Sequence, residues 1–354
     1  MTGILYLEDG TVYKGKGFGA AATNVGELVF NTAMAGYQEI LTDPTAAGQV
    51  INMTYPLIGN YGVSLIDNQS ERIHAFGLIA HDISLRPSNR CSVMSISEWL
   101  DEQGVPGIHN LDTRAITKKI RTNGTCKCVI STEGISKERA HELIDETEPS
   151  TGFEYRTRIE SIGTGLKVAV IDLGIKKCAL DALTGRGCKV KLFPPGTASG
   201  VILAAEPDGL FLSDGPGAPD GCGPIIKTTA ELMRRLPVFG TGLGHLVTAR
   251  AAGGKTYKML YGHRGINHGI EDTVTGKTYI TSQNHGYAVE AESLRGSGFE
   301  VSYINLNDGT VEGMKHESLP VFTSAFSPEG GPGPNDAEAL YDRFIAMMGG
   351  DLNA

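Results

Sequence analysis

Short apolar runs alternate with helical stretches from residue 166 onward, and this alternation constrains the fold more than any other feature of the sequence. The runs are rich in β-branched and aromatic residues and have the length of strands: Lys167–Asp172, Lys189–Phe193, Gly209–Ser213 and Leu236–Phe239. A helix is expected between the first two runs, over Lys176–Leu183. Strands that alternate with helices form mainly parallel sheets with helices on both faces. The sequence therefore predicts an α/β fold for residues 166–354.

The end of this region has a different pattern. From Lys277 to Phe326 the predicted strands follow one another through short turns, which indicates an antiparallel far edge of the sheet. Asn335–Glu338 has the spacing of a capping box, and the residues after it predict a closing helix. Leu340, Phe344 and Met347 would form the apolar face of that helix.

Residues 1–150 are instead predicted to form a β-rich N-terminal domain. Helices are expected there around Ser95–Glu102 and over Asp112–Thr122, where Asp112 can cap the N-terminus. The polar stretch 151–165 follows and is predicted to be a linker. A chain of 354 residues has ample length for two domains, each with its own core.

Composition excludes several classes of partner. The formal net charge of −9 argues against nucleic acid and against an anionic membrane surface, because both are bound through basic patches. No apolar run has the length of a membrane span, and the N-terminal residues lack a signal-peptide pattern, so a cytoplasmic location is expected. The 6 cysteines are scattered, as reduced thiols are, and predict no metal site.

The run Pro237–His245 has the layout of a nucleophile elbow, in which a strand turns sharply on glycines and opens a helix. Such a turn exposes one side chain beside free backbone N–H groups. Gly242 stands where that side chain should be, and glycine has none. Three more segments could complete a site: Ser213–Pro219, Gln283–Tyr287 and Ser327–Pro334. The first and last of these should meet the elbow at the carboxyl ends of the strands.

These four segments, in this order, resemble the class I glutamine amidotransferase domain. Over nearly the whole chain the sequence is similar to the small subunit family of carbamoyl-phosphate synthase, through the following runs: Phe30–Pro44, Tyr55–Gly62, Leu111–Arg114, Lys255–Met259 and Gly262–His268. The resemblance implies that the N-terminal domain docks on a large subunit, and that a cysteine, a histidine and a glutamate hydrolyse glutamine to ammonia. It implies no cofactor in this chain, since ATP, magnesium and bicarbonate would bind the large subunit.

The sequence departs from that family pattern around the pocket. By resemblance, Gly242 stands at the nucleophile position and Ser327 at the position of the base, whereas Glu329 keeps the orienting carboxylate. Leu246 and Ala325 replace glutamines, and Thr45 replaces a serine near the N-terminal motif. The remaining positions match the family's glutamine contacts: Gly215, Gly217, Leu243, Asn284, Gly286 and Tyr287. Loss of a nucleophile and a base predicts a pseudoenzyme whose glutaminase is inactive.

Two alternatives stay open at this stage. Cys222 could be an unforeseen nucleophile of an active glutaminase, or the chain could be a stand-alone regulatory binding module. A dinucleotide site at Gly240–Gly244 is disfavoured, because the spacing is G-x-G-x-G and no acidic residue follows at the distance that holds a ribose. The sequence does not distinguish arginine from pyrimidine biosynthesis.

Overall fold

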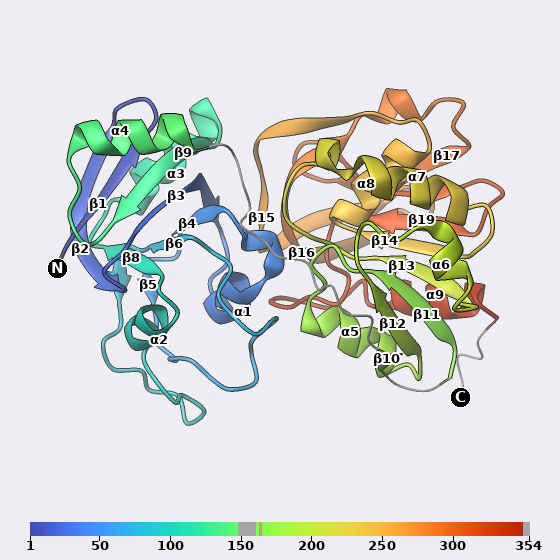
Figure 1. Cartoon of the computed structure of the whole chain (residues 1–354), viewed down its shortest axis with the longest axis horizontal. Helices are drawn as coiled ribbons and strands as arrows, with labels where there is room; N and C mark the ends of the chain where they lie inside the picture. Colours follow the sequence, from blue (N-terminus) through green and yellow to red (C-terminus); the bar gives the residue numbers. More distant parts are fainter. Residues whose placement is uncertain (148–160, 163–164, 350–354) are drawn as a thin grey trace. The chain divides into compact units, whose positions relative to one another are not determined.

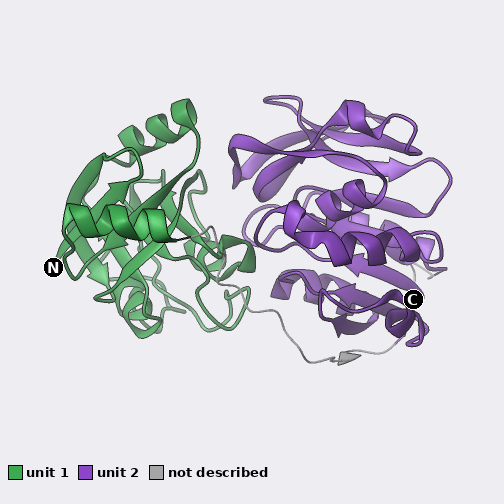
Figure 2. Ribbon diagram, turned by 45° about the horizontal axis from the view of Figure 1, so that its top comes forward, with its two compact units in different colours: residues 1–153 green, residues 154–354 purple. Residues whose placement is uncertain are grey.

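A computed structural model describes residues 1–147, 161–162 and 165–349. The chain divides into two compact units, Met1–Phe153 and Glu154–Ala354, which are coloured separately in Figure 2. The predicted linker 151–165 lies largely outside the described residues. Within it, Ser161–Ile162 form a short strand, β10, that pairs antiparallel with β12 (Lys189–Phe193). No helix in the described part of the chain is long and apolar enough to cross a membrane.

Unit 1 is built on a closed barrel whose strand order is β1-β2-β8-β6-β4-β3-β9 (Figure 1). The bounds of its strands are β1 Thr2–Leu7, β2 Val12–Gly19, β3 Thr23–Asn31, β4 Gln49–Met53, β6 Gly77–Ile79, β8 Pro106–His109 and β9 Cys126–Ser131. A separate pair is formed by β5 (Leu57–Ile58) and β7 (Asp82–Ile83). The β-rich character was predicted, but closure into a barrel was not.

The predicted helices of unit 1 are confirmed. In α2 (Ile96–Glu102) the Ser95 side chain and Glu98 form a capping box, and in α3 (Thr113–Asn123) the Asp112 carboxylate accepts from the Ala115 N–H at 2.9 Å. These contacts satisfy backbone donors that a helix leaves unpaired at its start. The structure adds helices that were not predicted: α1 (Tyr37–Thr42), α4 (Lys137–Glu146) and the single turn η1 (Pro44–Ala46).

Unit 2 contains a ten-stranded sheet in the order β10-β12-β11-β13-β14-β19-β18-β16-β15-β17. Strands β12, β11, β13, β14 and β19 run parallel, and the remaining strands run antiparallel to their neighbours, as predicted for the far edge. Their bounds are β11 Lys167–Ile171, β13 Gly209–Leu212, β14 Val238–Thr241, β15 Thr256–Asp272, β16 Thr278–Val289, β17 Phe299–Asn305, β18 Val311–His316 and β19 Val321–Ser324.

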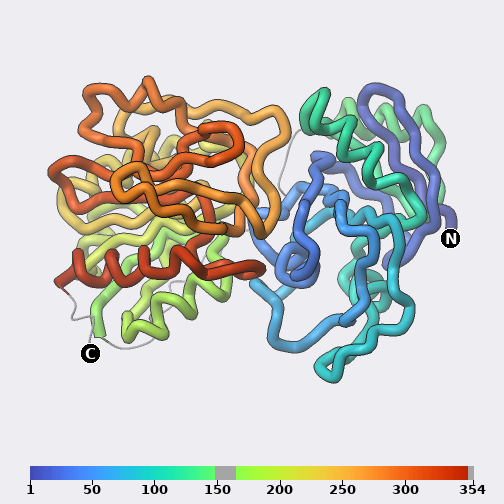
Figure 3. The backbone as a smooth tube through the Cα atoms, turned by 180° about the vertical axis from the view of Figure 1, so that it is seen from behind, coloured from blue at the N-terminus to red at the C-terminus, as the bar shows by residue number. Residues whose placement is uncertain are grey.

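Helices cover both faces of the parallel part of this sheet. On one face, α6 (Ser199–Leu203), α7 (Gly223–Leu232) and α8 (Leu243–Ala251) pack into one apolar core. On the other, α5 (Lys177–Thr184) and α9 (Ala339–Met347) close a second core around stacked aromatic rings (Figures 1 and 3). The sheet is therefore held rigidly beneath the loops that follow its strands.

The predicted capping box of the closing helix is wrong. Helix α9 begins at Ala339, and Glu338 caps it without a side-chain hydrogen bond. The Asn335 amide instead donates to the Glu338 carboxylate at 2.8 Å, and Glu338 also pairs with Arg186. The apolar face was predicted correctly, because Leu340 and Phe344 are buried in the second core.

Candidate functional site

The candidate site lies where four parallel strands end. Strands β11, β13, β14 and β19 are adjacent in the sheet, so the residues after each one meet at its carboxyl edge. Thr241 is in register with Ser324, and the Gly242 N–H donates to the Ser324 carbonyl at 2.9 Å. This backbone hydrogen bond joins the elbow to the end of β19.

The elbow takes the strained conformation that its glycines allow. Gly242, at the N-cap of α8, has a φ of 50° and a ψ of −113°. Residues other than glycine rarely adopt this backbone conformation. A Cβ atom at Gly244 would lie 2.3 Å from the Leu212 carbonyl oxygen, so helix α8 packs directly on the end of β13. The turn between β14 and α8 is fixed by this close approach.

Asp214 reaches into the elbow from the loop after β13. Its Oδ1 atom accepts from the Gly215 N–H at 2.7 Å and from the Leu243 N–H at 2.8 Å. A Cβ atom built on Gly242 would lie 1.9 Å from the same oxygen. The sequence analysis placed Asp214 in the loop Ser213–Pro219 but gave its side chain no role, although an acidic residue just after a buried strand of a parallel sheet was a signal for one.

Lys176 occupies the other half of the site. Its ammonium group donates to the Ser327 hydroxyl at 2.5 Å and lies 3.0 Å from the Glu329 carboxylate. Tyr341 donates to the second oxygen of Glu329 at 3.0 Å, and the Cys178 thiol contacts the first at 3.8 Å. Lys176, Cys178 and Tyr341 were not predicted. The position of Lys176 soon after β11 was the available signal for the first of them.

Several predicted positions around the elbow are packed rather than open. Leu243 and Leu246 are buried in the apolar core beneath α8, and Ala325 is buried after β19. His245 contacts the Thr323 hydroxyl through Nδ1 at 2.7 Å. Burial, its largest cause, lowers the pKa of His245 to about 3, so the imidazole is neutral at physiological pH.

The remaining predicted contacts lie on β16, on the loop after β13 and in unit 1. Asn284 is in register with Arg264 of β15, and a Cβ atom on Gly286 would lie 3.1 Å from the same guanidinium, while Tyr287 borders the apolar core. Gly217 has a φ of +98°, which suits the tight loop. Thr45 lies in unit 1, where its N–H donates to Asp43 at 2.8 Å.

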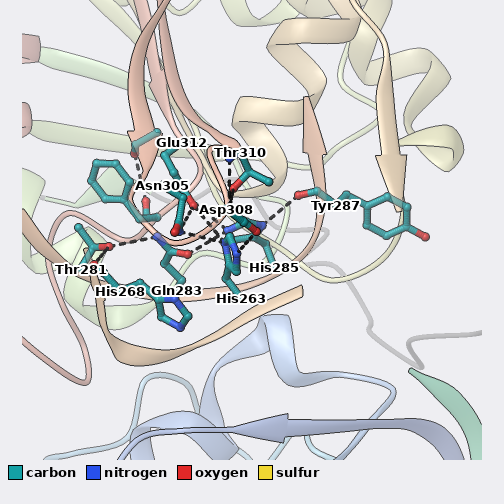
Figure 4. A network of polar contacts seen from close by, with 12 residues as sticks. His263, His268, Thr281, Gln283, His285, Tyr287, Asn305, Asp308, Thr310 and Glu312 are labelled. Carbon is teal, nitrogen blue, oxygen red and sulfur yellow. Dashed lines mark hydrogen bonds and ion pairs between the residues drawn. The ribbon is translucent and has the colours of Figure 1, made fainter. Parts of the chain in front are cut away.

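A buried network of histidines and carboxylates includes His285, whose Nδ1 contacts the Tyr287 carbonyl (Figure 4). The Glu312 carboxylate is 3.1 Å from His263 Nδ1 and 3.7 Å from His285 Nε2, and Asp308 is 3.0 Å from His263 Nε2. These atoms of His263, His285 and Glu312 lie close enough together to hold a metal ion. The Asn305 amide donates to Glu312 at 2.8 Å, which completes the network as a hydrogen-bonded ion-pair cluster.

Opposing effects act on this cluster. Burial disfavours a charge on His263, but the hydrogen bonds and charges of Glu312 and Asp308 outweigh it and raise the pKa of His263. Burial likewise disfavours a charge on Glu312, but the hydrogen bond with His263 and the nearby ring of His285 hold the pKa of this carboxyl well below its usual value. Glu312 is therefore ionised, and His263 is the group most able to balance it.

Cys222 is buried in the loop that follows β13. Its thiol contacts the Ala218 carbonyl at 3.8 Å in the short turn η2 (Pro219–Cys222). Burial, followed by the charge of Asp220, raises the pKa of this thiol. A thiol with a raised pKa forms little of the thiolate that attacks a carbonyl.

Comparison with known families first defines the class of unit 2. Residues 169–347 match the family model described as Glutamine amidotransferase class-I. Together with the parallel sheet and its elbow, this match defines unit 2 as a class I glutamine amidotransferase domain. Residues 5–130 match the model described as Carbamoyl-phosphate synthase small chain, CPSase domain. The chain belongs to the carbamoyl-phosphate synthase small-chain family.

Relatives match it from end to end. A protein of Clostridium acetobutylicum named carbamoyl phosphate synthase small chain is 50% identical over 351 residues, which cover 98% of this chain and 100% of the relative. A protein of the same name from Fusobacterium nucleatum is 42% identical and covers 98% of each chain. The pyrimidine-specific small chain of Lactiplantibacillus plantarum is 39% identical and covers 98% of this chain and 96% of the relative.

Proposed function

We propose that this chain is the small subunit of a carbamoyl-phosphate synthase that works from free ammonia, and that its own glutamine hydrolysis is lost. The observation that carries the proposal is Gly242, which stands at the elbow and offers no attacking atom. Removal of a nucleophile or base costs on the order of 10⁶-fold in rate, and the losses do not add because the groups act as a unit.

The second half of the site supports the same proposal. Ser327 stands at the position of the base, and its hydroxyl accepts from Lys176, which is held by Glu329. A serine hydroxyl cannot take up a proton near neutral pH as an imidazole can. Ser327 therefore does not replace the base.

The family membership supports the partner. We propose that the chain binds a large subunit through unit 1, and that ATP, magnesium and bicarbonate are used there, in the cytoplasm. Unit 1 carries the sequence match that is particular to small chains.

The test is carbamoyl phosphate formation by this chain with its cognate large subunit, with glutamine or ammonium chloride as nitrogen donor. Synthesis from ammonia alone is the expected result, and the large subunit without this chain is the control. Comparable synthesis from glutamine would overturn the proposal and direct attention to Cys222. Failure to form a complex would favour the stand-alone binding module instead.

A further inference from the structure

Two backbone N–H groups of the site point at one oxygen atom. The Gly215 N–H, from the loop after β13, and the Leu243 N–H, at the start of α8, lie 2.7 Å and 2.8 Å from Asp214 Oδ1. Paired backbone donors of this kind stabilise the oxyanion that develops during acyl transfer. In this chain the oxygen that they hold belongs to the protein itself.

The same carboxylate fills the volume of a side chain at position 242. A Cβ atom there would lie 1.9 Å from Oδ1, 2.0 Å from Cγ and 2.3 Å from Oδ2 of Asp214. Distances this short lie far inside van der Waals contact. The observed position of Asp214 therefore requires glycine at 242, and any side chain there requires the carboxylate to leave.

We propose that Asp214 is an internal plug of the oxyanion hole. Its carboxylate occupies the two donors and displaces any acyl ligand from them. The inference rests on the proposed function in one respect, namely that this pocket is the disused glutaminase site. The carbonyl of a ligand would have to displace the Asp214 carboxylate from the two N–H groups. Because this carboxylate is part of the chain, its effective concentration beside the donors is high.

The first experiment is chemical rescue with formate. Asp214→Ala empties the hole, so about 100 mM formate should raise the Tm of this variant by about 2–4 °C and leave that of the native chain unchanged. Sodium chloride at equal ionic strength corrects for salt. Asp112→Ala is the matched control, because its carboxylate also accepts from a backbone N–H, at the start of α3. Equal effects of formate on all three proteins would overturn the proposal.

A second experiment tests the same contact from position 242. Gly242→Ala is made in the native chain and in the Asp214→Ala variant, and urea unfolding is measured for all four proteins. The added Cβ atom clashes with the carboxylate only when Asp214 is present, so Gly242→Ala should lower the urea midpoint more in the native chain than in the Asp214→Ala variant. Equal losses would overturn the plug. Glutamine hydrolysis by the native chain would instead overturn the proposed function, so the two failures are distinguishable.

Discussion

At the scale of single residues, Lys176 gives Glu329 its present role. The sequence suggested a carboxylate left over from a triad, but the structure pairs it with an ammonium group at 3.0 Å, and the two side chains are only 3% and 5% exposed. A charge that is buried this deeply persists only when it is paired and hydrogen-bonded. Tyr341 and Ser327 supply the hydrogen bonds. Glu329 is the counter-ion of Lys176.

Glu329→Gln should therefore destabilise the protein strongly. The change leaves Lys176 buried without its counter-ion, and breaking a buried pair typically costs about 3–5 kcal/mol in the free energy of unfolding. Urea unfolding measures the loss. Glu338→Gln is the control, since its pair with Arg186 is partly exposed and should be worth about 1 kcal/mol or less. Equal losses in the two variants would contradict this role of Glu329.

Cys222 provides a second test at this scale. Because burial raises the pKa of its thiol, iodoacetamide should modify Cys222 much more slowly than the exposed Cys91 at neutral pH. Peptide mass spectrometry gives both rates in one sample. Cys222→Ser should leave ammonia-dependent synthesis unchanged. Rapid alkylation of Cys222, together with loss of a glutamine-dependent activity, would favour the active-glutaminase alternative.

At the scale of elements, three antiparallel strands share one buried charge cluster. His263 on β15, His285 on β16 and Glu312 on β18 bring their side chains together (Figure 4). Strands β15 and β16 pair with register shifts around His263, and the cluster is a polar link between β15 and β18 at this point. The strands around Asn284 and Tyr287 are therefore held together by ion pairs whose strength depends on pH.

Glu312→Gln should lower the free energy of unfolding, most strongly between about pH 4.5 and pH 6.5. The raised pKa of His263 gives stability that is full below its unfolded value of 6.5 and is lost as the pH rises through the folded pKa. The lowered pKa of Glu312 gives stability that is present above 4.5 and is lost as the pH falls.

Urea unfolding at several pH values checks this dependence, and the difference from the native chain should shrink above pH 6.5 by up to about 1.4 kcal/mol per pH unit. Glu300→Gln is the control, because its pair with Lys315 is partly exposed. A difference that does not change with pH would show that His263 carries no charge in the folded protein.

Local signals in the sequence were enough for many elements but not for their assembly. The helix around Ser95–Glu102, the cap at Asp112 and the parallel strands of unit 2 follow from short-range chemistry, and they were predicted. The closed barrel depends on pairing between distant segments, and β15 was missed because its glycines and polar residues hide the alternation of a strand. In the site, Gly242 and Ser327 could be predicted from motif positions. The side chains that enter from neighbouring loops, Asp214 and Lys176, could not, because a motif does not specify where their atoms point.

At the scale of the whole molecule, family membership and the chemistry of the site are separate questions. The chain is 50% identical to a named small chain over almost its full length, so the fold and the family are secure. The proposed loss of glutamine hydrolysis rests on Gly242 and Ser327, which follow the neighbouring strands β14 and β19 of one sheet. Family membership supports the partner and the assembly, whereas the proposal about the nitrogen donor rests on these two positions.

The intact chain should accordingly gain no stability from glutamine. In the proposed plug, Asp214 occupies the two donors that would hold the amide carbonyl, and Leu246, where the resemblance predicts a polar contact, packs in the apolar core. A ligand stabilises the folded state by RT ln(1 + [L]/Kd), so a micromolar Kd would add about 5 kcal/mol at about 10 mM glutamine and raise the Tm by many degrees. We expect a Tm shift below about 1 °C, no larger than that caused by asparagine at the same concentration. Titration calorimetry checks the affinity directly, and a micromolar Kd would show that the pocket still opens for its substrate and that the carboxylate of Asp214 yields to it.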